Sequence, residues 1–429
     1  MSEPPQHGRL VGRLFRVLAA LCLLGGAARA EPAAPLRVGL VLPDPGPTPA
    51  VTALTAAIAT ATGATFETLR LSPATSRAAL TKGPRPVDAL LILGGPGPLA
   101  GDELAALREL LGATRGLLVL GAVPESWPAD PGFFREVVGA ESAGSFANGA
   151  PMSVINLFAH PVFFGIGQFE AAGGFPSWSK LADDVEILME GTVGEDTTPL
   201  AWVRRASSRR LCHLVPAAAA QFADPAYQRL AAQALLWVCR RAIPGAVPIV
   251  QRTFMPDSYP GSFAITFPEG PGVCLDPVRG GINFIWDGDF VDLRPRWLTK
   301  QGAPARVVGE RFYEEKSWQP LRSGTPKGEA GLKFRGFAFR NGQPEFHYEI
   351  DGREVRETLR ALPAGAGISR EFHVGPGTRA LWLTLDPQSA SEVATRGLQR
   401  DGPHARFAAP EGGSFTIEIR RRSGGGTAP

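Results

Sequence analysis

The sequence predicts a two-part fold: an α/β domain with a parallel sheet, followed by an all-β sandwich. In the first half, short apolar runs typical of buried strands alternate with segments of helical periodicity, which favours a parallel sheet. In the second half, apolar residues recur at every second position between short turns, and strong helical patterns are absent. The length of 429 residues also favours two cores over one.

The elements of the first half follow from local patterns. Strands are expected at 37–42, 65–71, 87–93, 116–120, 153–158, 185–188, 200–203 and 211–215, and helices at 51–61, 102–111 and 224–241. The run at 87–93 (VDALLIL) is almost continuously apolar, as in strands that a parallel sheet buries on both faces. The last helix is the best defined, because Asp224 is a suitable N-cap, Pro225 suits the first turn and Pro244 stops it.

The second half is predicted to contain β-hairpins. Phe346, Tyr348 and Ile350 alternate with polar residues, and Asn341-Gly342 and Asp351-Gly352 are suitable two-residue turns. The segment 243–250 (IPGAVPIV) is expected to be a linker. We therefore expect an α/β domain at 36–243, a β-sandwich domain at 251–420 and a disordered tail at 421–429.

The first thirty residues, 1–30, have the pattern of an export signal. Arg9, Arg13 and Arg16 precede an apolar run at 17–24, and Ala28-Arg29-Ala30 is a small-x-small cleavage site. The apolar run is too short to cross a bilayer comfortably, and no later stretch predicts a transmembrane helix. The expected location is periplasmic or extracellular, after cleavage near Ala30.

Charge and cysteine usage narrow the function classes. The segment 1–30 holds four of the 44 basic and one of the 41 acidic residues, so the rest of the chain has 40 of each. This balance does not predict a nucleic-acid partner. Cys212, Cys239 and Cys274 form neither a disulfide framework nor a metal motif. A Cys212–Cys239 bridge stays open, although buried thiols are the favoured interpretation. No cofactor and no metal are expected.

The clearest motifs lie between His160 and Ala242. They are His160-Pro161-x-x-x-Gly165-Ile166, Pro199-x-Ala201-Trp202, and a strand–helix unit at 210–238. In this order they resemble the trehalose-utilisation (ThuA-like) family, over roughly 36–243. The resemblance implies a flavodoxin-like three-layer domain of the class I glutamine amidotransferase type, associated with carbohydrates. The segments 280–290 and 342–349 resemble β-domains appended to secreted ThuA-like proteins, which carry no known activity.

The positions that carry chemistry in these families are substituted. Class I amidotransferases place a Cys nucleophile on the turn after a strand, and ThuA-like proteins often have a His near this point; here the turn begins at Gly121. No Cys occurs between Glu31 and Leu211, which excludes acyl-enzyme chemistry on a thiolate in this region. The family Gly-His pair after the last strand corresponds to Ala217-Ala218, so general base catalysis of the family type is also lost.

Candidate ligand contacts follow the strands, because open parallel sheets bind ligands beyond their carboxyl ends. Gly95 and Gly97 could present backbone N–H groups to an anion, but a plain tight turn is the favoured interpretation, since the Lys-Ser/Thr of phosphate loops is missing. Trp127 and Trp178 are further candidates for ligand binding. The set Trp286, Trp297 and Trp318 could stack on sugars, although packing residues are the favoured interpretation.

The candidate catalytic residues are Asp44, Glu125 and His160. Two carboxylates at a set distance can cleave a glycosidic bond, but two solvated loop acids are the favoured alternative. His160 either lines the cleft or bonds a loop. We therefore expect an exported ThuA-like protein that binds a carbohydrate or a protein partner without catalysis. The alternative is a sugar-active hydrolase or isomerase that uses these three residues, and a third hypothesis is that the β-domain docks the protein to an extracytoplasmic assembly.

Overall fold

The computed structural model describes residues 35–42, 46–69, 87–94, 101–121, 131–145, 152–156, 160–167, 169–171, 175–193, 195–206, 209–268, 270–288, 291–293, 295–296, 302–328, 331–386 and 388–422. The predicted export signal and all but the first two residues of the predicted tail lie outside these ranges. None of the helices among the described residues is long and apolar enough to span a membrane.

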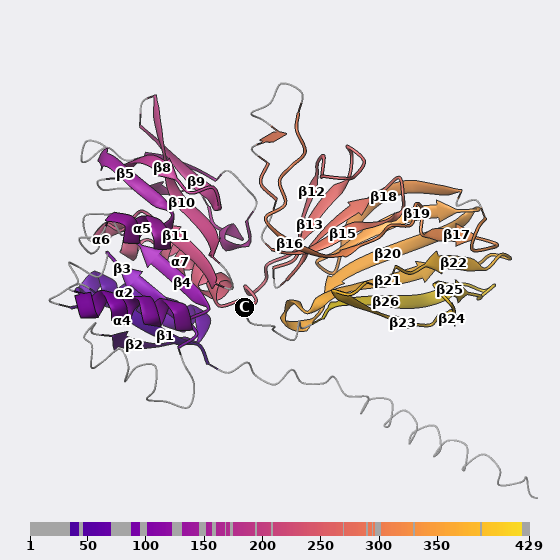
Figure 1. Cartoon of the computed structure of the whole chain (residues 1–429), viewed down its shortest axis with the longest axis horizontal. Coiled ribbons are helices and arrows are strands. Elements are labelled where there is room, and N and C mark those ends of the chain that lie inside the picture. Colours follow the sequence, from indigo (N-terminus) through magenta and orange to yellow (C-terminus); the bar gives the residue numbers. More distant parts are fainter. Residues whose placement is uncertain are drawn as a thin grey trace, which may run out of the picture. The chain divides into compact units, whose positions relative to one another are not determined.

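The first half is built on a nine-stranded sheet (Figure 1). Its parallel part has the order β2-β1-β3-β4-β11, formed by β1 (Arg37–Val41), β2 (Thr65–Leu69), β3 (Ala89–Leu93), β4 (Gly116–Leu120) and β11 (Arg209–Leu214). The sheet continues in the order β10-β9-β6-β7, with β10 (Asp196–Ala206), β9 (Val185–Val193), β6 (Met152–Asn156) and β7 (Glu170–Ala171). Both β3 and β4 are buried along their whole length, as their apolar runs predict.

The parallel pattern expected for the whole half ends at β11. β10 is antiparallel to both β11 and β9, and β6 is antiparallel to β9. Short connections join β10 to β9 and to β11, which suits antiparallel hairpins, whereas parallel neighbours need a long crossover. A separate two-stranded sheet, β5 (Ala140–Ser145) with β8 (Pro176–Leu181), was not predicted.

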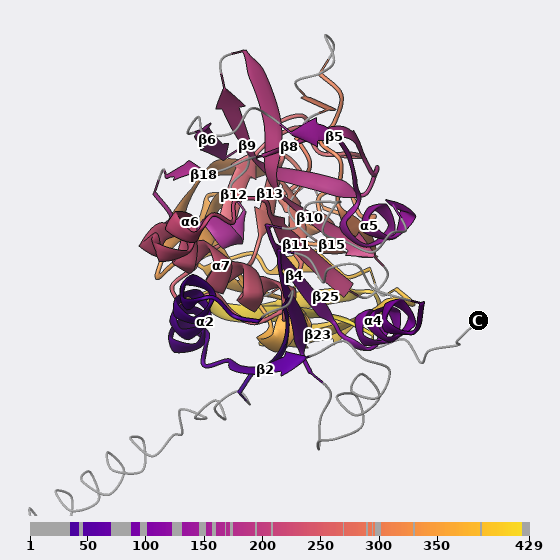
Figure 2. The same ribbon diagram turned by 90° about the vertical axis from the view of Figure 1, so that its left-hand side faces the viewer.

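Helices cover both faces of the parallel strands. α2 (Pro49–Thr62) and α7 (Pro225–Val238) pack together on one side, and α4 (Gly101–Ala113) and α5 (Pro131–Val138) lie on the other (Figure 2). The Asp224 side chain accepts a hydrogen bond of 2.8 Å from the Ala226 N–H, which confirms the predicted cap of α7. A short helix, α6 (Ala219–Ala223), precedes α7.

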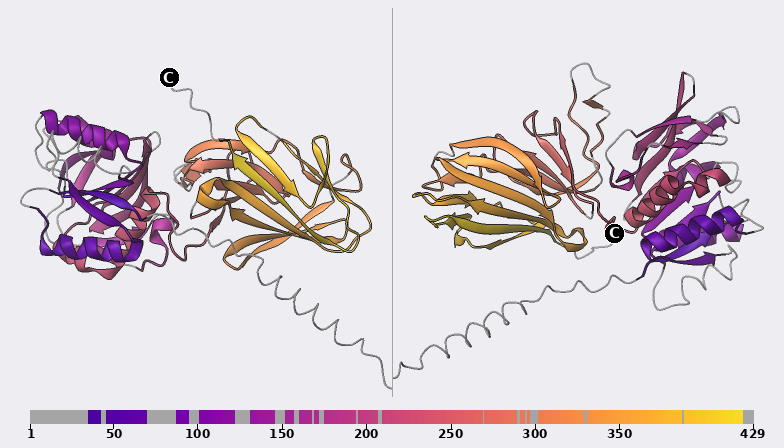
Figure 3. Two further views of the ribbon diagram at one scale, coloured as in Figure 1. Left: turned by 90° about the horizontal axis from the view of Figure 1, so that it is seen from below. Right: turned by 180° about the vertical axis from the view of Figure 1, so that it is seen from behind.

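The second half contains three antiparallel sheets, seen from two further sides in Figure 3. The five-stranded sheet has β12 (Ile249–Arg252), β13 (Phe263–Thr266), β14 (Gly272–Asp276), β15 (Gly281–Gly288) and β16 (Gly309–Glu314). The six-stranded sheet has β18 (Leu332–Arg340), β19 (Gln343–Ile350), β20 (Arg353–Ala361), β21 (Gly367–Val374), β26 (Gly413–Arg421) and β23 (Ser391–Arg396). The four-stranded sheet has β17 (Leu321–Ser323), β22 (Leu381–Thr384), β25 (His404–Phe407) and β24 (Gln399–Asp401).

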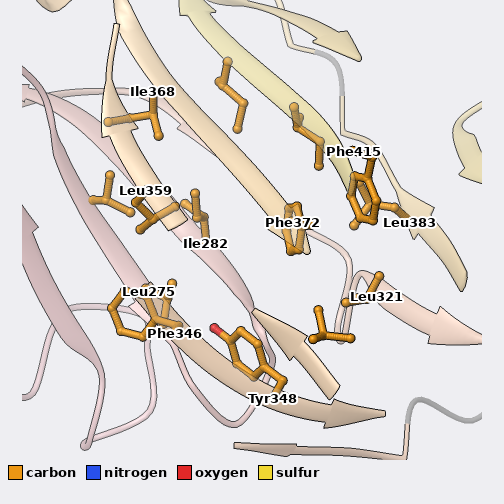
Figure 4. Close-up of a cluster of buried hydrophobic side chains, with 14 of the residues drawn as sticks. Leu275, Ile282, Leu321, Phe346, Tyr348, Leu359, Ile368, Phe372, Leu383 and Phe415 are labelled. Carbon is orange, nitrogen blue, oxygen red and sulfur yellow. The ribbon is translucent and has the colours of Figure 1, made fainter. Parts of the chain in front are cut away.

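One apolar core takes side chains from all three sheets (Figure 4). Phe346, Tyr348 and Ile350 point into it, as their period of two predicts, and Phe372 stacks on Phe415 at 4.6 Å between ring centroids. Burial of large apolar side chains is the main source of stability in such a layer. The predicted hairpin turns are both present, because Asn341-Gly342 and Asp351-Gly352 have positive φ and join consecutive strands.

Two details of the second half differ from the sequence-based expectation. β12 begins at Ile249, inside the predicted linker, and β26 continues to Arg421, where it pairs with Ser391. Trp286 is fully buried in a second apolar cluster, on the other face of the five-stranded sheet, so it is a packing residue. Trp318 is exposed, and Trp297 lies outside the described residues.

Candidate functional site

The carboxyl ends of the central parallel strands are joined through backbone hydrogen bonds at two glycines. Gly94, after β3, donates its N–H to the Leu120 carbonyl at 2.8 Å, and Gly121, after β4, donates to the Leu214 carbonyl at 2.8 Å. Both have left-handed backbones, with φ of +70° and +63°. Glycine adopts this conformation without steric penalty, so each strand can turn sharply at its end.

Gly121 is pressed against the segment that follows β11. A Cβ atom added at Gly121 would overlap the Cβ atom of Ala217, whereas a Cβ atom added at Gly94 would meet nothing within 4 Å. The space next to the Gly121 Cα atom is therefore filled by the Ala217 methyl group. Gly121 and Ala217 form one packed contact, which leaves no room for a side chain at position 121.

Tyr227 fastens the segment that carries Ala217. Its hydroxyl donates to the Pro216 carbonyl, and the Val215 N–H donates to the Leu200 carbonyl at 2.8 Å. Burial raises the pKa of the Tyr227 phenol above its ordinary value, so the group remains a neutral donor. Ala218 precedes α6 and provides no side-chain cap. These contacts position the backbone, and none of them supplies a base.

An aromatic cluster surrounds His213, the penultimate residue of β11. The His213 ring is fully buried and lies 4.3 Å from the Trp202 ring, edge to face, and Trp202 lies 5.1 Å from Trp178. Phe134 of α5 packs against both His213 and Trp178. The Trp178 Nε1–H donates to the Pro199 carbonyl at 3.0 Å, and the Trp178 side chain is only half-buried. Trp178, predicted as a ligand contact, thus packs against this cluster and keeps part of its indole accessible.

His160 lies at the other edge of the sheet. Its Nδ1 accepts a hydrogen bond of 3.3 Å from the Val162 N–H at the start of η2 (Pro161–Phe163), and its ring packs 5.2 Å from Trp237. The Trp237 carbonyl accepts from Arg210, which stands at the start of β11. The strand from Arg210 to Leu214 rises by roughly 13 Å, so His160 is not brought to Gly121 and Ala217. Its contact with Val162 matches the loop-bonding interpretation.

The remaining predicted site residues, Asp44, Gly95, Gly97, Glu125 and Trp127, lie outside the described residues. Among the residues that the structure does describe, no three His, Cys, Asp or Glu side chains lie close enough to hold a metal ion.

The environments of Cys239 and Cys274 disfavour the reactive thiolate form. Cys239 and Cys274 are free, which excludes the bridge between Cys212 and Cys239 that the sequence left open. Burial raises the pKa of both thiols to about 12, and an uncharged thiol is a poor nucleophile and metal ligand.

The comparisons with known proteins concern part of the chain. No family model matches the sequence, and no curated protein does. A solved structure described as ThuA-like, from Bacteroides uniformis ATCC 8492, is 16% identical with a TM-score of 0.40 and covers 50% of this chain and 95% of that one. A second one, from Parabacteroides merdae ATCC 43184, is 13% identical with a TM-score of 0.36 and covers 53% and 95%.

A third solved structure, the carbohydrate deacetylase Agd3, is 14% identical with a TM-score of 0.35. It covers 53% of this chain and 37% of that one. Similarity at these identities and TM-scores says nothing about the activity of this chain.

Proposed function

We propose that this chain is an exported ThuA-like protein whose α/β domain binds a carbohydrate or a protein partner and no longer catalyses a reaction. The observation that carries the proposal is the contact between Gly121 and Ala217. It fills, with a methyl group, the place where a class I glutamine amidotransferase-like domain would hold its reactive side chain.

The strand order supports the fold part of the proposal. Parallel strands in the order β2-β1-β3-β4-β11, with helices on both faces, have the arrangement of flavodoxin-like sheets. Such sheets bind ligands beyond the carboxyl ends of their strands, which here include Gly94 and Gly121. We propose domain limits of 36–243 and 251–420 on the same basis, with β12 extending the second domain to Ile249.

The side chains near this edge support binding over catalysis. Tyr227 holds its proton, and His213 is enclosed by Trp202 and Phe134. His160 lies at the opposite edge, so the alternative of a sugar hydrolase would have to work without it. A half-exposed indole such as that of Trp178 can stack on the apolar face of a sugar, which favours a carbohydrate over other small ligands.

A thermal-shift screen of the purified protein against mono- and disaccharides tests the binding proposal. One class of sugar should raise the melting temperature in a concentration-dependent way, because a ligand that binds only the folded state stabilises it. The shift should disappear in Glu125→Ala and persist in the control Glu141→Ala, whose exposed carboxylate pairs with Arg135. A flat screen contradicts the carbohydrate part of the proposal.

The loss of catalysis has a separate test. The sugars that give a shift should be recovered unchanged after long incubation with the protein. Turnover that Glu125→Ala abolishes would contradict the proposal and support the sugar-active enzyme instead.

A further inference from the structure

Two carboxylates and one guanidinium are buried together inside the β-sandwich. The side chains of Glu315, Glu357 and Arg370 are 2%, 0% and 1% exposed. The Arg370 Nε donates to Glu357 Oε1 at 2.6 Å, and its Nη1 donates to Glu315 Oε1 at 3.3 Å. Charges in an apolar core are strongly unfavourable unless they are paired, so these three groups depend on one another.

The strands force two of these groups inward. Glu357 stands between Val355 and Leu359 in β20, and Arg370 stands between Ile368 and Phe372 in β21. All four of these neighbours point into the apolar core, and the period of two places the charged side chains on the same face. Tyr348 of β19 also directs its hydroxyl into this core (Figure 4).

Glu315 reaches the same point from a loop. It follows β16, and its Oε2 accepts a hydrogen bond of 2.8 Å from the Ile282 N–H. A Cβ atom at Gly281 would overlap this oxygen, so the glycine makes room for the carboxylate. The Glu315 side chain is therefore held in a specific place in the core.

Glu315 shares the Arg370 guanidinium with Glu357, so one positive charge contacts two carboxylates. Arg370 contacts both carboxylates, whereas Arg279 donates to the Asn283 side chain and to the backbone carbonyls of Glu315 and Ser317. Burial raises the pKa of Glu315 to about 7; Arg370 and Arg279 oppose this shift, and the Glu357 and Asp386 carboxylates add to it. Burial also raises the pKa values of Tyr313 and Tyr348, which stay neutral. The titratable groups near Glu315 are Tyr313 (β16), Glu357 (β20), Arg370 (β21), Arg279 (before β15) and Asp386 (after β22), and Tyr348 (β19) faces Glu357 and Arg370.

The loop that begins at Glu315 carries the most exposed tryptophan among the described residues. Trp318 is 59% exposed, in the segment 315–320. Asp386 Oδ2 accepts from the Lys316 and Ser317 N–H groups at 3.0 and 3.1 Å, and Arg279 donates to the Ser317 carbonyl at 2.6 Å. The groups that surround the buried carboxylate are thus the groups that hold the loop.

We propose that the segment 315–320 is a pH-sensitive latch, closed while the buried Glu315 carboxyl is neutral and released when that group ionises. In the closed state Glu315 is buried, and in the released state water can hydrate it. Hydration returns the carboxyl towards its ordinary pKa of 4.5, so the closed state binds the proton more tightly. The closed state is therefore most stable below pH 4.5. Its stability falls as the pH rises from 4.5 towards 7 and changes little above pH 7.

Amide hydrogen exchange of the purified protein tests the latch. After correction for intrinsic exchange rates, the protection of the peptide that contains Lys316 and Ser317 should fall roughly tenfold for each pH unit between about 5 and 7, and then level off. Glu315→Gln should remove this slope. The control Glu314→Gln alters the neighbouring, 47% exposed carboxylate and should keep it.

Three results would overturn the proposal. One is wild-type protection that does not change with pH, and another is the wild-type slope persisting in Glu315→Gln. The third is an equal loss of protection in β20, which would show global unfolding and not a local release. A further measurement does not need the variant to fold: infrared difference spectra of the wild type should show a protonated carboxyl band that disappears near pH 7. Absence of this band would also overturn the proposal.

Discussion

The carboxyl edge of the parallel sheet and the core of the β-sandwich differ in where they place reactive groups. At the carboxyl edge of the sheet, among the residues that the structure describes, Gly121 meets Ala217, and neither of these side chains can exchange a proton. In the sandwich, where a plain apolar core is expected, Glu315, Glu357 and Arg370 are fully buried. The described contact at the sheet edge is apolar, whereas the described core of the sandwich holds three charged groups.

The two regions differ in how far their contacts depend on charged side chains. At the sheet edge, the backbone hydrogen bond between Gly121 and Leu214 does not depend on any side chain. A buried ion pair cannot lose one member without leaving the other uncompensated. The stability of each of the three sandwich charges therefore depends on the other two.

Replacement of Arg370 should have the largest effect on the free energy of unfolding. Arg370→Met leaves the Glu315 and Glu357 carboxylates without their shared guanidinium, and should lower the free energy of unfolding by about 3–5 kcal/mol. Urea denaturation followed by tryptophan fluorescence measures this change. Adding Glu315→Gln and Glu357→Gln to Arg370→Met should recover much of the loss. If Arg370→Met is as stable as the wild type, the three charges are not interdependent.

Gly121→Ala should have the next largest effect. A left-handed backbone disfavours alanine by about 1–2 kcal/mol, and overpacking against Ala217 adds about 1–3 kcal/mol. Gly94→Ala is the matched control, because Gly94 has nearly the same φ and open space around its Cα. The extra loss in Gly121→Ala should be relieved by Ala217→Gly in a double-mutant cycle. Equal losses at both glycines would show that the contact with Ala217 is not tight.

The pH dependence of stability compares the two regions directly. Because the pKa of Glu315 is raised from 4.5 to about 7, the folded state binds a proton that the unfolded state releases across this range. Stability therefore falls as the pH rises from about 5 to 7, by roughly 1.4 kcal/mol per unit for this one group at most. The difference between wild type and Glu315→Gln in urea melts at pH 5.5 and 7 isolates the effect. No counterpart is expected for Gly121→Ala, whose deficit should not depend on pH.

The sequence predicts the elements of both regions better than their contacts. Apolar runs located β3 and β4, and the period of two located the hairpins around Asn341-Gly342 and Asp351-Gly352. The same period places Glu357 and Arg370 on the core-facing side of their strands. From either strand alone, however, this pattern shows only a charged residue at an apolar position and not the partner that compensates it. Their partner Glu315 lies 55 residues from Arg370 in a loop, and no local pattern indicates that pairing.

In the candidate site, too, the sequence predicts the elements better than the contacts between them. The substitutions at Gly121 and Ala217 are visible in the sequence, but their mutual contact depends on how the turn after β4 meets the turn after β11. The sequence left open whether His160 lines the cleft or hydrogen-bonds a loop, and packing against Trp237 places it towards the amino edge of the sheet. Asp44 and Glu125 remain predictions.

The smallest predicted effect concerns the segment that fills the site. Tyr227→Phe removes the hydroxyl that donates to the Pro216 carbonyl and leaves that acceptor without this donor, at an expected loss of about 1–2 kcal/mol. Urea denaturation measures the loss, and Tyr313→Phe is a control in the other region. If the hydroxyl of Tyr227 holds Ala217 against Gly121, then Tyr227→Phe should also weaken the coupling between Gly121→Ala and Ala217→Gly. An unchanged coupling energy would mean that strand pairing alone, through Val215 and Leu200, keeps the methyl group over the turn.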